Sequence, residues 1–191
     1  MSRMPKIPDA QISHIGIYVS GLDRMVDFYG RVLGFMVTDR GPLPSGAPEY
    51  VFMSRDPNEH HQLILVSGRP ADVPSQIVQL SLKVPSLADM RIMYGIVTAD
   101  ADAHNIQTRA HGVAWSLYFR DPEDNTIEIF TPSPWYVNAP SAVPFSFDDM
   151  TDAEIYDHVA AAVKLKPGYS TYDEWREDAA RRMRDGGHWS G

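Results

Sequence analysis

Hydrophobic and polar residues alternate in two separate stretches of the chain. In residues 12–19 the aliphatic side chains of Ile15, Ile17 and Val19 fall on one side, and this period of two is typical of a half-buried strand. Residues 77–84 begin a second stretch in the same way. Each stretch is followed by residues at helical spacing, which are Leu22, Met25, Val26, Tyr29 and Leu33 in the first half and Leu87, Met90, Tyr94 and Val97 in the second.

This internal repeat determines the predicted fold class. Further strands are expected where short apolar runs are separated by turn-forming residues, around residues 35–38, 50–53, 62–66, 115–119 and 126–130. The second helix is expected to continue in pieces through residues 99–107. The sequence therefore predicts an α+β protein of two βαβββ modules with a C-terminal helical extension.

The predicted organisation has four parts, which are a leader at 1–11, a first module at 12–69, a second module at 70–137, and a Pro-rich connection with a helical tail at 138–191. Two capping boxes, Thr151 with Glu154 and Thr171 with Glu174, predict two helices in the tail. The tail carries no catalytic constellation, so we expect it to pack on a module surface or on a second subunit.

Composition narrows the possible functions. The chain has 191 residues and a formal net charge of −8, which argues against a nucleic-acid partner because there is no basic stripe to contact phosphates. No apolar run approaches the roughly 20 residues of a membrane helix, and the N-terminus lacks the apolar region of a signal peptide, so a cytoplasmic protein is expected. Cysteine is absent; a bound metal would need nitrogen and oxygen ligands.

Two polar residues occupy matching places at the start of the two modules. His14 shares a strand face with Gly16 and Tyr18 and so points away from the helix-packed core. A lone histidine in a strand is more often a hydrogen-bonded structural residue than a ligand. Gln79 stands in the corresponding place of the second module. Its amide oxygen could bind a divalent ion or simply bond neighbouring side chains.

Glu128 interrupts an otherwise apolar strand in the second module. Burial of a carboxylate without a cation or donors costs several kcal/mol, so Glu128 either belongs to a site or lies in solvent on an edge strand. The matching residue of the first module is Ile64, which cannot bind metal. The repeat thus offers His14, Gln79 and Glu128 as three ligands and leaves coordination positions open, as in catalytic metal sites.

Three further residues could move or hold protons near these ligands. His61, next to His60, lies three residues before Ile64, where an acid/base with a pKa near neutrality would be useful. His111 and Tyr118 lead into the strand before Glu128 and could hydrogen-bond a bound oxyanion. Aromatic residues expected near the site could stack a planar ligand, namely Tyr18, Trp115 and Phe130.

Three segments, residues 14–19, 27–35 and 121–128, carry a resemblance to a known family. Through them residues 12–137 resemble the vicinal oxygen chelate superfamily, which includes glyoxalase I, the fosfomycin and bleomycin resistance proteins and the type I extradiol ring-cleavage dioxygenases. The resemblance implies that the two modules pair into a half-open barrel. The superfamily hosts many chemistries, so these segments indicate the fold more than the reaction.

The narrower resemblance is to the extradiol dioxygenases. It implies that His14 and Glu128 are metal ligands and that His61 is the catalytic acid/base, with Tyr118 and His111 holding the ring oxygens of the substrate. Gln79 departs from the family, which has a second histidine ligand there. The implied metal is Fe(II), with Mn(II), Ni(II), Co(II) or Zn(II) as alternatives.

The expected function is a metal-dependent dioxygenase that cleaves a catechol-like aromatic diol with O2, in a homo-oligomer of two or more copies. One alternative is a metal-dependent lyase, isomerase or epimerase of the glyoxalase type, although glyoxalase I carries a glutamate in the place of Ile64. The other alternative is a metal-free protein that sequesters small molecules. Metal analysis of protein purified without chelator would distinguish the two metal-dependent enzymes from the metal-free binding protein.

Overall fold

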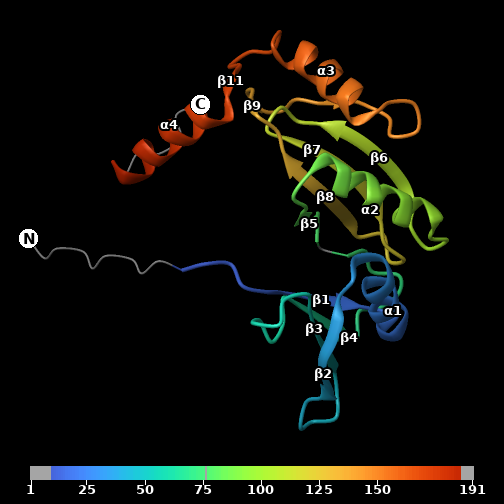
Figure 1. Ribbon diagram of the computed structural model, residues 1–191. Coiled ribbons are helices and arrows are strands. Elements are labelled where there is room, and N and C mark those ends of the chain that lie inside the picture. Colours follow the sequence, from blue (N-terminus) through green and yellow to red (C-terminus); the bar gives the residue numbers. More distant parts are fainter. Residues whose placement is uncertain (1–9, 76, 186–191) are drawn as a thin grey trace, which may run out of the picture. The chain divides into compact units, whose positions relative to one another are not determined.

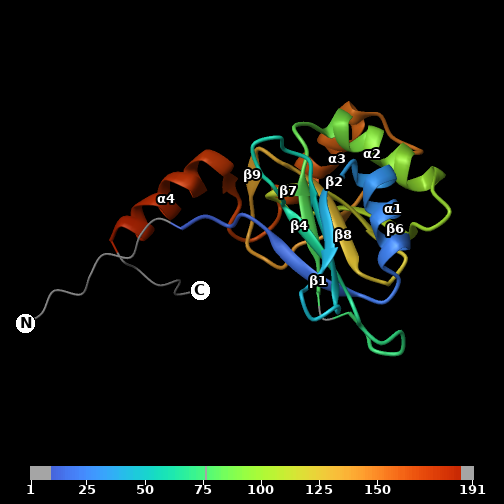
Figure 2. The same ribbon diagram turned by 90° about the horizontal axis from the view of Figure 1, so that it is seen from below.

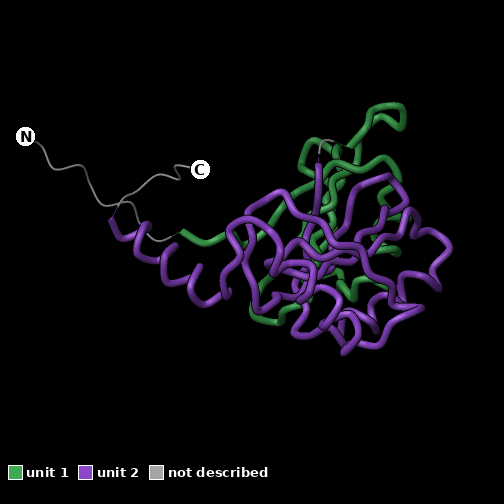
Figure 3. The backbone as a smooth tube through the Cα atoms, turned by 90° about the horizontal axis from the view of Figure 1, so that it is seen from above, with its two compact units in different colours: residues 1–75 green, residues 76–191 purple. Residues whose placement is uncertain are grey.

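The structure, a computed structural model, describes residues 10–75 and 77–185. The chain forms two compact units, residues 1–75 and residues 76–191 (Figure 3). Most of the predicted leader, residues 1–9, and the end of the predicted tail, residues 186–191, lie outside the described residues.

Unit 1 is a four-stranded sheet with one helix. Its strands follow the order β1-β4-β3-β2, with β1 parallel to β4 and the other pairs antiparallel. The elements are β1 (Ile15–Val19), α1 (Leu22–Leu33), β2 (Met36–Pro42), β3 (Glu49–Ser54) and β4 (Leu63–Ser67) (Figure 1).

The core of unit 1 follows from the alternation in β1. Ile17 and Val19 are buried, as are Met25 and Phe28 of α1, while Tyr18 is 60% exposed. Side chains alternate across a strand, so α1 covers one face of the sheet and Gly16 and Tyr18 belong to the other.

Unit 2 repeats this arrangement around a larger sheet. The strand order is β10-β6-β7-β8-β5, which makes β8 an internal strand. The elements are β5 (Leu80–Lys83), α2 (Leu87–Ala99), β6 (His104–Ala110), β7 (Ala114–Arg120), β8 (Thr126–Pro132) and the edge strand β10 (Val143–Pro144). The helix α2 begins after Ser86, whose hydroxyl accepts a hydrogen bond from the Asp89 amide at 3.1 Å.

The expected continuation of the second helix through residues 99–107 is wrong. The helix α2 ends at Ala99 because Asp100 adopts an extended conformation. Residues 104–110 instead form β6, which pairs antiparallel with β7. Apolar and polar residues show little alternation in this segment. It forms a strand because its backbone hydrogen-bonds to that of β7.

The second module ends with β9 (Trp135–Tyr136), and the tail contains α3 (Asp152–Val163), β11 (Ser170–Thr171) and α4 (Tyr172–Arg184). Both predicted capping boxes are present at the starts of α3 and α4. The helices α2 and α3 lie close together in Figure 2, and Arg91 of α2 donates to the Asp152 carboxylate at 2.7 Å. Arg91 also donates to the carbonyl oxygens of Phe147 and Met150, at 2.6 and 2.7 Å.

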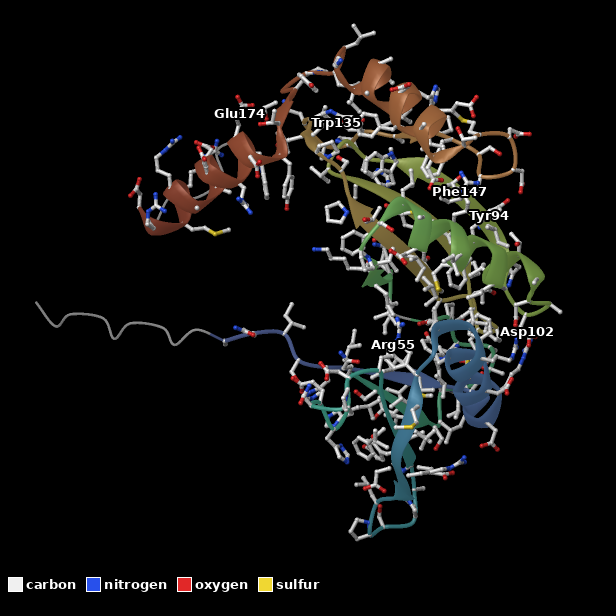
Figure 4. The ribbon with its side chains drawn as sticks, viewed as in Figure 1. Arg55, Tyr94, Asp102, Trp135, Phe147 and Glu174 are labelled. Carbon is white, nitrogen blue, oxygen red and sulfur yellow. The ribbon has the colours of Figure 1, made fainter. Side chains whose placement is uncertain are left out.

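Aromatic rings strengthen this packing of the first part of the tail. Tyr94 of α2 and Phe147 lie side by side, with ring centroids 5.3 Å apart (Figure 4). Trp135 packs on Trp115 of the sheet at 5.5 Å. In contrast, α4 has no buried residue among those described.

The predicted class is confirmed: the protein is α+β, with a βαβββ module in each unit and a helical C-terminal part. Neither sheet closes into a barrel within the described residues, and the pairing of the modules into a half-open barrel stays a prediction. None of the helices in residues 10–75 and 77–185 has the length and apolar character needed to cross a membrane.

Candidate metal and substrate site

The strand register of the two units contains the same positional pattern. In unit 1 the parallel pair of β1 and β4 sets Gly16 opposite Ile64. In unit 2 the parallel pair of β5 and β8 sets Ser81 opposite Glu128. His14 and Gln79 each lie two residues before these partners, immediately ahead of the first strand of their unit. The positions matched from the sequence repeat are therefore matched in the backbone as well.

One face of the unit 2 sheet carries a row of polar side chains. Pairing places Ser81, Glu128, Tyr118 and Gln107 side by side on the four strands β5, β8, β7 and β6. The residues that alternate with them are apolar and buried against the helices, and they include Leu117, Phe119, Ile127 and Ile129. Successive residues of a strand point to opposite faces, so the polar row lies on the face away from α2.

Glu128 lies at the centre of this row and is only 8% exposed. Because β8 is internal, the edge-strand alternative is excluded. Its Oε1 accepts a hydrogen bond from the Tyr118 hydroxyl at 2.5 Å. Its Oε2 accepts from the Gln79 amide at 2.8 Å and from the Ser81 hydroxyl at 2.6 Å. Both carboxylate oxygens thus accept hydrogen bonds from neutral donors.

Tyr118 connects Glu128 to a histidine. Burial, followed by the hydrogen bond to Glu128 and the charge of that carboxylate, raises the pKa of Tyr118 to about 12. The phenol therefore keeps its proton at neutral pH. Its oxygen lies 2.9 Å from Nε2 of His111, and Nδ1 of His111 lies 2.7 Å from the carbonyl oxygen of Ser141.

The Ser141 carbonyl fixes the orientation of His111. A carbonyl oxygen can only accept a hydrogen bond, so Nδ1 of His111 carries a hydrogen and Nε2 faces the phenol of Tyr118. A continuous series of polar contacts then runs from Ser141 through His111 and Tyr118 to Glu128, in which the single phenol hydrogen of Tyr118 can be donated either to Oε1 of Glu128 or to Nε2 of His111. Ser141 belongs to the Pro-rich connection, so this segment of the tail contributes to the site.

Two of the three predicted metal ligands fit a divalent cation. The Gln79 amide nitrogen is 2.8 Å from the Glu128 carboxylate, and no arginine or lysine of the described residues pairs with that buried negative charge. Carboxylate and amide oxygens suit hard or borderline divalent ions. Ligation by Gln79 requires its amide to turn, so that Oε1 instead of Nε2 faces the ion.

Clusters of three or more His, Cys, Asp or Glu side chains placed to hold a metal do not occur in the part of the chain that the structure describes. The fit in unit 2 therefore rests on one carboxylate and one amide.

The remaining predicted residues lie together in unit 1. The exposed ring of His14 is 4.4 Å from that of His61, centroid to centroid. His61 also contacts Phe52 at 5.1 Å, and its Nδ1 is 3.0 Å from Nδ1 of His60. Burial, followed by the charges of His14 and His60, lowers the pKa of His61. At neutral pH His61 is therefore a neutral imidazole that can accept a proton.

The expectation that Trp115 would stack a ligand near Glu128 is wrong. In β7 it is three residues from Tyr118 and points to the opposite face, where it packs on Trp135 and Tyr156. Phe130, two residues after Glu128, is on the same face as the polar row. The ligand role of His14 stays a prediction, because the strand register alone supports it.

Sequence reasoning missed two residues of this face. Ser81 bonds the carboxylate of Glu128 directly, and its position two residues after Gln79 on the same strand face could have revealed it. Arg109 lies on β6, with its guanidinium carbon 5.7 Å from the centre of the Tyr118 ring. The sequence feature that could have revealed Arg109 is its position two residues before His111. Both residues have polar side chains that an exposed strand would also carry.

Together the fold and the polar row define a class of α+β protein, in which two βαβββ modules are joined in one chain and the second carries a row of polar side chains on one face of its sheet. Residues 11–129 match the family model of the Glyoxalase/Bleomycin resistance protein/Dioxygenase superfamily, and the chain belongs to this superfamily. The resemblance inferred from the sequence is thereby confirmed.

Two relatives, one of them a named dioxygenase, are similar to this chain in sequence. The chain is 27% identical over 125 residues to biphenyl-2,3-diol 1,2-dioxygenase 3 of Rhodococcus globerulus, an alignment that covers 62% of this chain and 62% of that protein. It is 24% identical over 122 residues to the uncharacterized protein YwbC of Bacillus subtilis, covering 63% of this chain and 96% of that one.

Solved structures agree on the fold. A glyoxylase/bleomycin resistance protein/dioxygenase domain from Frankia sp. superposes with a TM-score of 0.54 at 21% identity, covering 66% of this chain and all of that domain. A second structure is a mutant of the fosfomycin resistance protein FosX from Listeria monocytogenes, complexed with Mn(II) and a dihydroxypropylphosphonic acid. It superposes with a TM-score of 0.51 at 13% identity, covering 64% of this chain and 92% of that one.

Proposed function

We propose that this protein is a metal-dependent extradiol-type dioxygenase that cleaves a catechol-like aromatic diol with O2. The observation that carries the proposal is the buried carboxylate of Glu128, which is held by neutral donors beside Gln79 and connected to Tyr118 and His111. The similarity to a biphenyl-diol dioxygenase supports it.

His14, Gln79 and Glu128 would hold the metal, with Fe(II) as the proposed ion. A bound divalent ion with open positions acidifies the hydroxyl groups of a chelated diol. The ligand set has one imidazole, one amide and one carboxylate, so it carries the single negative charge of Glu128.

The other residues would bind and orient the diol. The Tyr118 phenol is protonated and donates, which suits a group that stabilises an oxyanion beside the carboxylate. His111 presents Nε2, which carries no hydrogen in the neutral ring, toward Tyr118 and can accept a proton from the phenol. His61, neutral because of its lowered pKa, would accept the proton of a substrate hydroxyl.

A non-redox reaction of the lyase or isomerase type is the second candidate, and Gln79 favours it. A neutral amide donates less electron density than an imidazole, which suits Mn(II), Ni(II), Co(II) or Zn(II) as a Lewis acid better than iron in oxygen chemistry. The FosX structure, with Mn(II) in its complex, shows that the fold accommodates such an ion.

The test is oxygen consumption by Fe(II)-loaded protein. Anaerobically loaded protein is mixed with a panel of substituted catechols, and oxygen is then admitted in an electrode cell. The proposal expects a yellow ring-opened product and one O2 consumed per catechol. Folded, iron-bound protein that takes up no oxygen with any catechol would contradict it, and activity of the Mn(II) protein on a non-redox substrate would then favour the second candidate.

A further inference from the structure

A cavity of about 290 Å³ opens on the polar face of the unit 2 sheet. The side chains that line it include Gln79, Gln107, His111 and Tyr118, so it adjoins the network around Glu128. No aspartate or glutamate is among its described lining residues, whereas Arg109 and Arg120 both are. The lining is therefore cationic, although the chain as a whole has a formal net charge of −8.

Neither arginine forms an ion pair with a carboxylate of the described residues. Within residues 10–75 and 77–185, Arg109 donates a hydrogen bond to the Gln107 amide oxygen. Arg120 donates to the carbonyl oxygen of Asp124 at 2.7 Å. A guanidinium group has five N–H donors in a planar fork, so these bonds to neutral oxygens leave most of the donors of both side chains for a ligand.

The strand register places the two arginines on both sides of the Tyr118 row. Arg109 pairs with Ser116, and Arg120 pairs with Thr126. Ser116 and Arg120 are each two residues from Tyr118 on β7, so all three rows share one face. The guanidinium carbon of Arg109 lies 5.7 Å from the centre of the Tyr118 ring, so its positive charge is close to this row.

We propose that the substrate carries a carboxylate on its ring substituent and that Arg109 and Arg120 bind this carboxylate in the unit 2 cavity. The planar guanidinium fork matches the two oxygens of a carboxylate. A cavity near the lower end of the usual range of ligand-pocket volumes holds one aromatic ring with a short side chain. The role of the anion as part of a substrate rests on the proposed function; its binding does not.

The inference distinguishes this chain from the biphenyl-diol relative, whose named substrate bears no charge. A purely structural role would use the arginines differently. In a purely structural role, Arg109 would only stack on Tyr118 and Arg120 would only close the hairpin turn. The cavity would then bind charged and uncharged ligands with equal affinity.

The experiment measures binding without metal or oxygen. Phenylacetate and phenylacetamide, which have the same ring and nearly the same shape, are titrated into metal-free full-length protein by NMR at low ionic strength. The proteins compared are the unaltered chain, Arg109→Gln, Arg120→Gln and the control Arg176→Gln, which removes a charge from an exposed ion pair on α4. Thermal unfolding confirms that each variant is folded.

Phenylacetate is expected to bind at least tenfold more tightly than phenylacetamide and to lose about tenfold in affinity in each cavity variant, with no change in Arg176→Gln. Its affinity should also fall as salt is added. Equal binding of the two probes, no binding of phenylacetate, or unchanged affinity in both cavity variants would overturn the proposal.

A second arm separates this proposal from the proposed function. Fe(II)-loaded protein is given 3,4-dihydroxyphenylacetate or its uncharged amide, and oxygen uptake is recorded. A preference for the acid that disappears in Arg109→Gln supports the carboxylate site. Arginine-dependent binding of phenylacetate without any oxygen uptake would preserve the anion site and remove the dioxygenase function.

Discussion

Neutral donors hold the Glu128 carboxylate in position and leave its charge uncompensated. Tyr118, Gln79 and Ser81 together supply a hydrogen bond to each oxygen. Burial of a carboxylate oxygen costs little free energy when the oxygen keeps its hydrogen bonds. A buried oxygen that loses its donor bears the full desolvation penalty. Single substitutions around Glu128 should therefore separate structural from metal-binding effects.

Tyr118→Phe should destabilise the protein by about 1–3 kcal/mol, because Oε1 of Glu128 loses its donor in a buried place. Urea unfolding measures the effect. The control is Tyr94→Phe, which removes a hydrogen bond from the same kind of phenol to the exposed Asp148 carboxylate. Its cost should be smaller, since water can replace the phenol there. Equal losses in the two variants would show that Glu128 does not depend on Tyr118.

Metal binding should fall sharply in Glu128→Ala and His14→Ala and persist in Gln79→His, because imidazole is the better ligand for transition metals. Metal content is measured by elemental analysis after loading and removal of excess ion. The control, Glu177→Ala, removes a carboxylate from the exposed helix α4. Stoichiometric metal in both alanine variants, or loss of metal in Gln79→His, would exclude this ligand set.

His61→Phe should leave metal binding intact and reduce turnover by about 10²–10⁴-fold, the usual contribution of general acid–base catalysis. The pKa of His61 is lowered, so its imidazole stays neutral to a lower pH than that of an ordinary histidine. Activity of the unaltered protein should fall only when the pH drops through that lowered pKa. His60→Phe is the matched control. A loss confined to His60→Phe would transfer the role to His60.

At the scale of elements, the sequence predicts those parts of the fold that carry a local signal. The alternation around Ile17 and the capping boxes at Thr151 and Thr171 each determine structure within a few residues, and each is present. Strand β6 carries no such signal, because its conformation depends on pairing with β7. Local pattern could not reveal that pairing.

The same distinction applies to the site. Glu128 is conspicuous in the sequence because a charge interrupts an apolar strand, and its burial bears this out. Ser81 and Arg109 look like ordinary polar residues of exposed strands, and only the register brings them beside Glu128 and Tyr118. The contribution of Ser141 comes from its backbone carbonyl, which no side-chain pattern can signal.

Gly112→Ala should destabilise the protein by about 1–3 kcal/mol. Gly112 lies in the turn between β6 and β7 with φ of +89°, and an added Cβ would come within 2.3 Å of the side chain of Val137. Gly95→Ala is the matched control. It lies in α2 with open space around it, so alanine should stabilise the helix by about 1 kcal/mol. Thermal unfolding compares the two, and an unchanged Tm for Gly112→Ala would contradict the prediction.

On the scale of the whole molecule, the first half of the tail makes most of the contacts that hold the tail to the rest of unit 2. Arg91 bonds two backbone carbonyls and one carboxylate of the segment leading into α3, and its guanidinium lies 4.7 Å from the centre of the Phe147 ring. One side chain on α2 thus satisfies backbone groups that would otherwise need water or another donor.

Arg91→Met should therefore loosen residues 145–155 while leaving the unit 2 sheet folded. Hydrogen exchange of the α3 amides should accelerate, whereas that of β7 and β8 should not change. Arg176→Met, on the exposed helix α4, serves as the control. Unchanged protection of α3 in Arg91→Met would show that the aromatic contacts of Phe147 and Trp135 hold the tail without it.

The carbonyl of Ser141 gives the C-terminal extension a chemical consequence. Because the acceptor is a peptide group, substitution of the side chain at residue 141 does not remove it. The Pro-rich connection therefore keeps the hydrogen of His111 on Nδ1 as long as the backbone at residue 141 stays in place. A chain ending before residue 141 would retain both modules, yet His111 could then exchange its hydrogen between the two ring nitrogens. The direction in which a proton passes between His111 and Tyr118 would no longer be fixed.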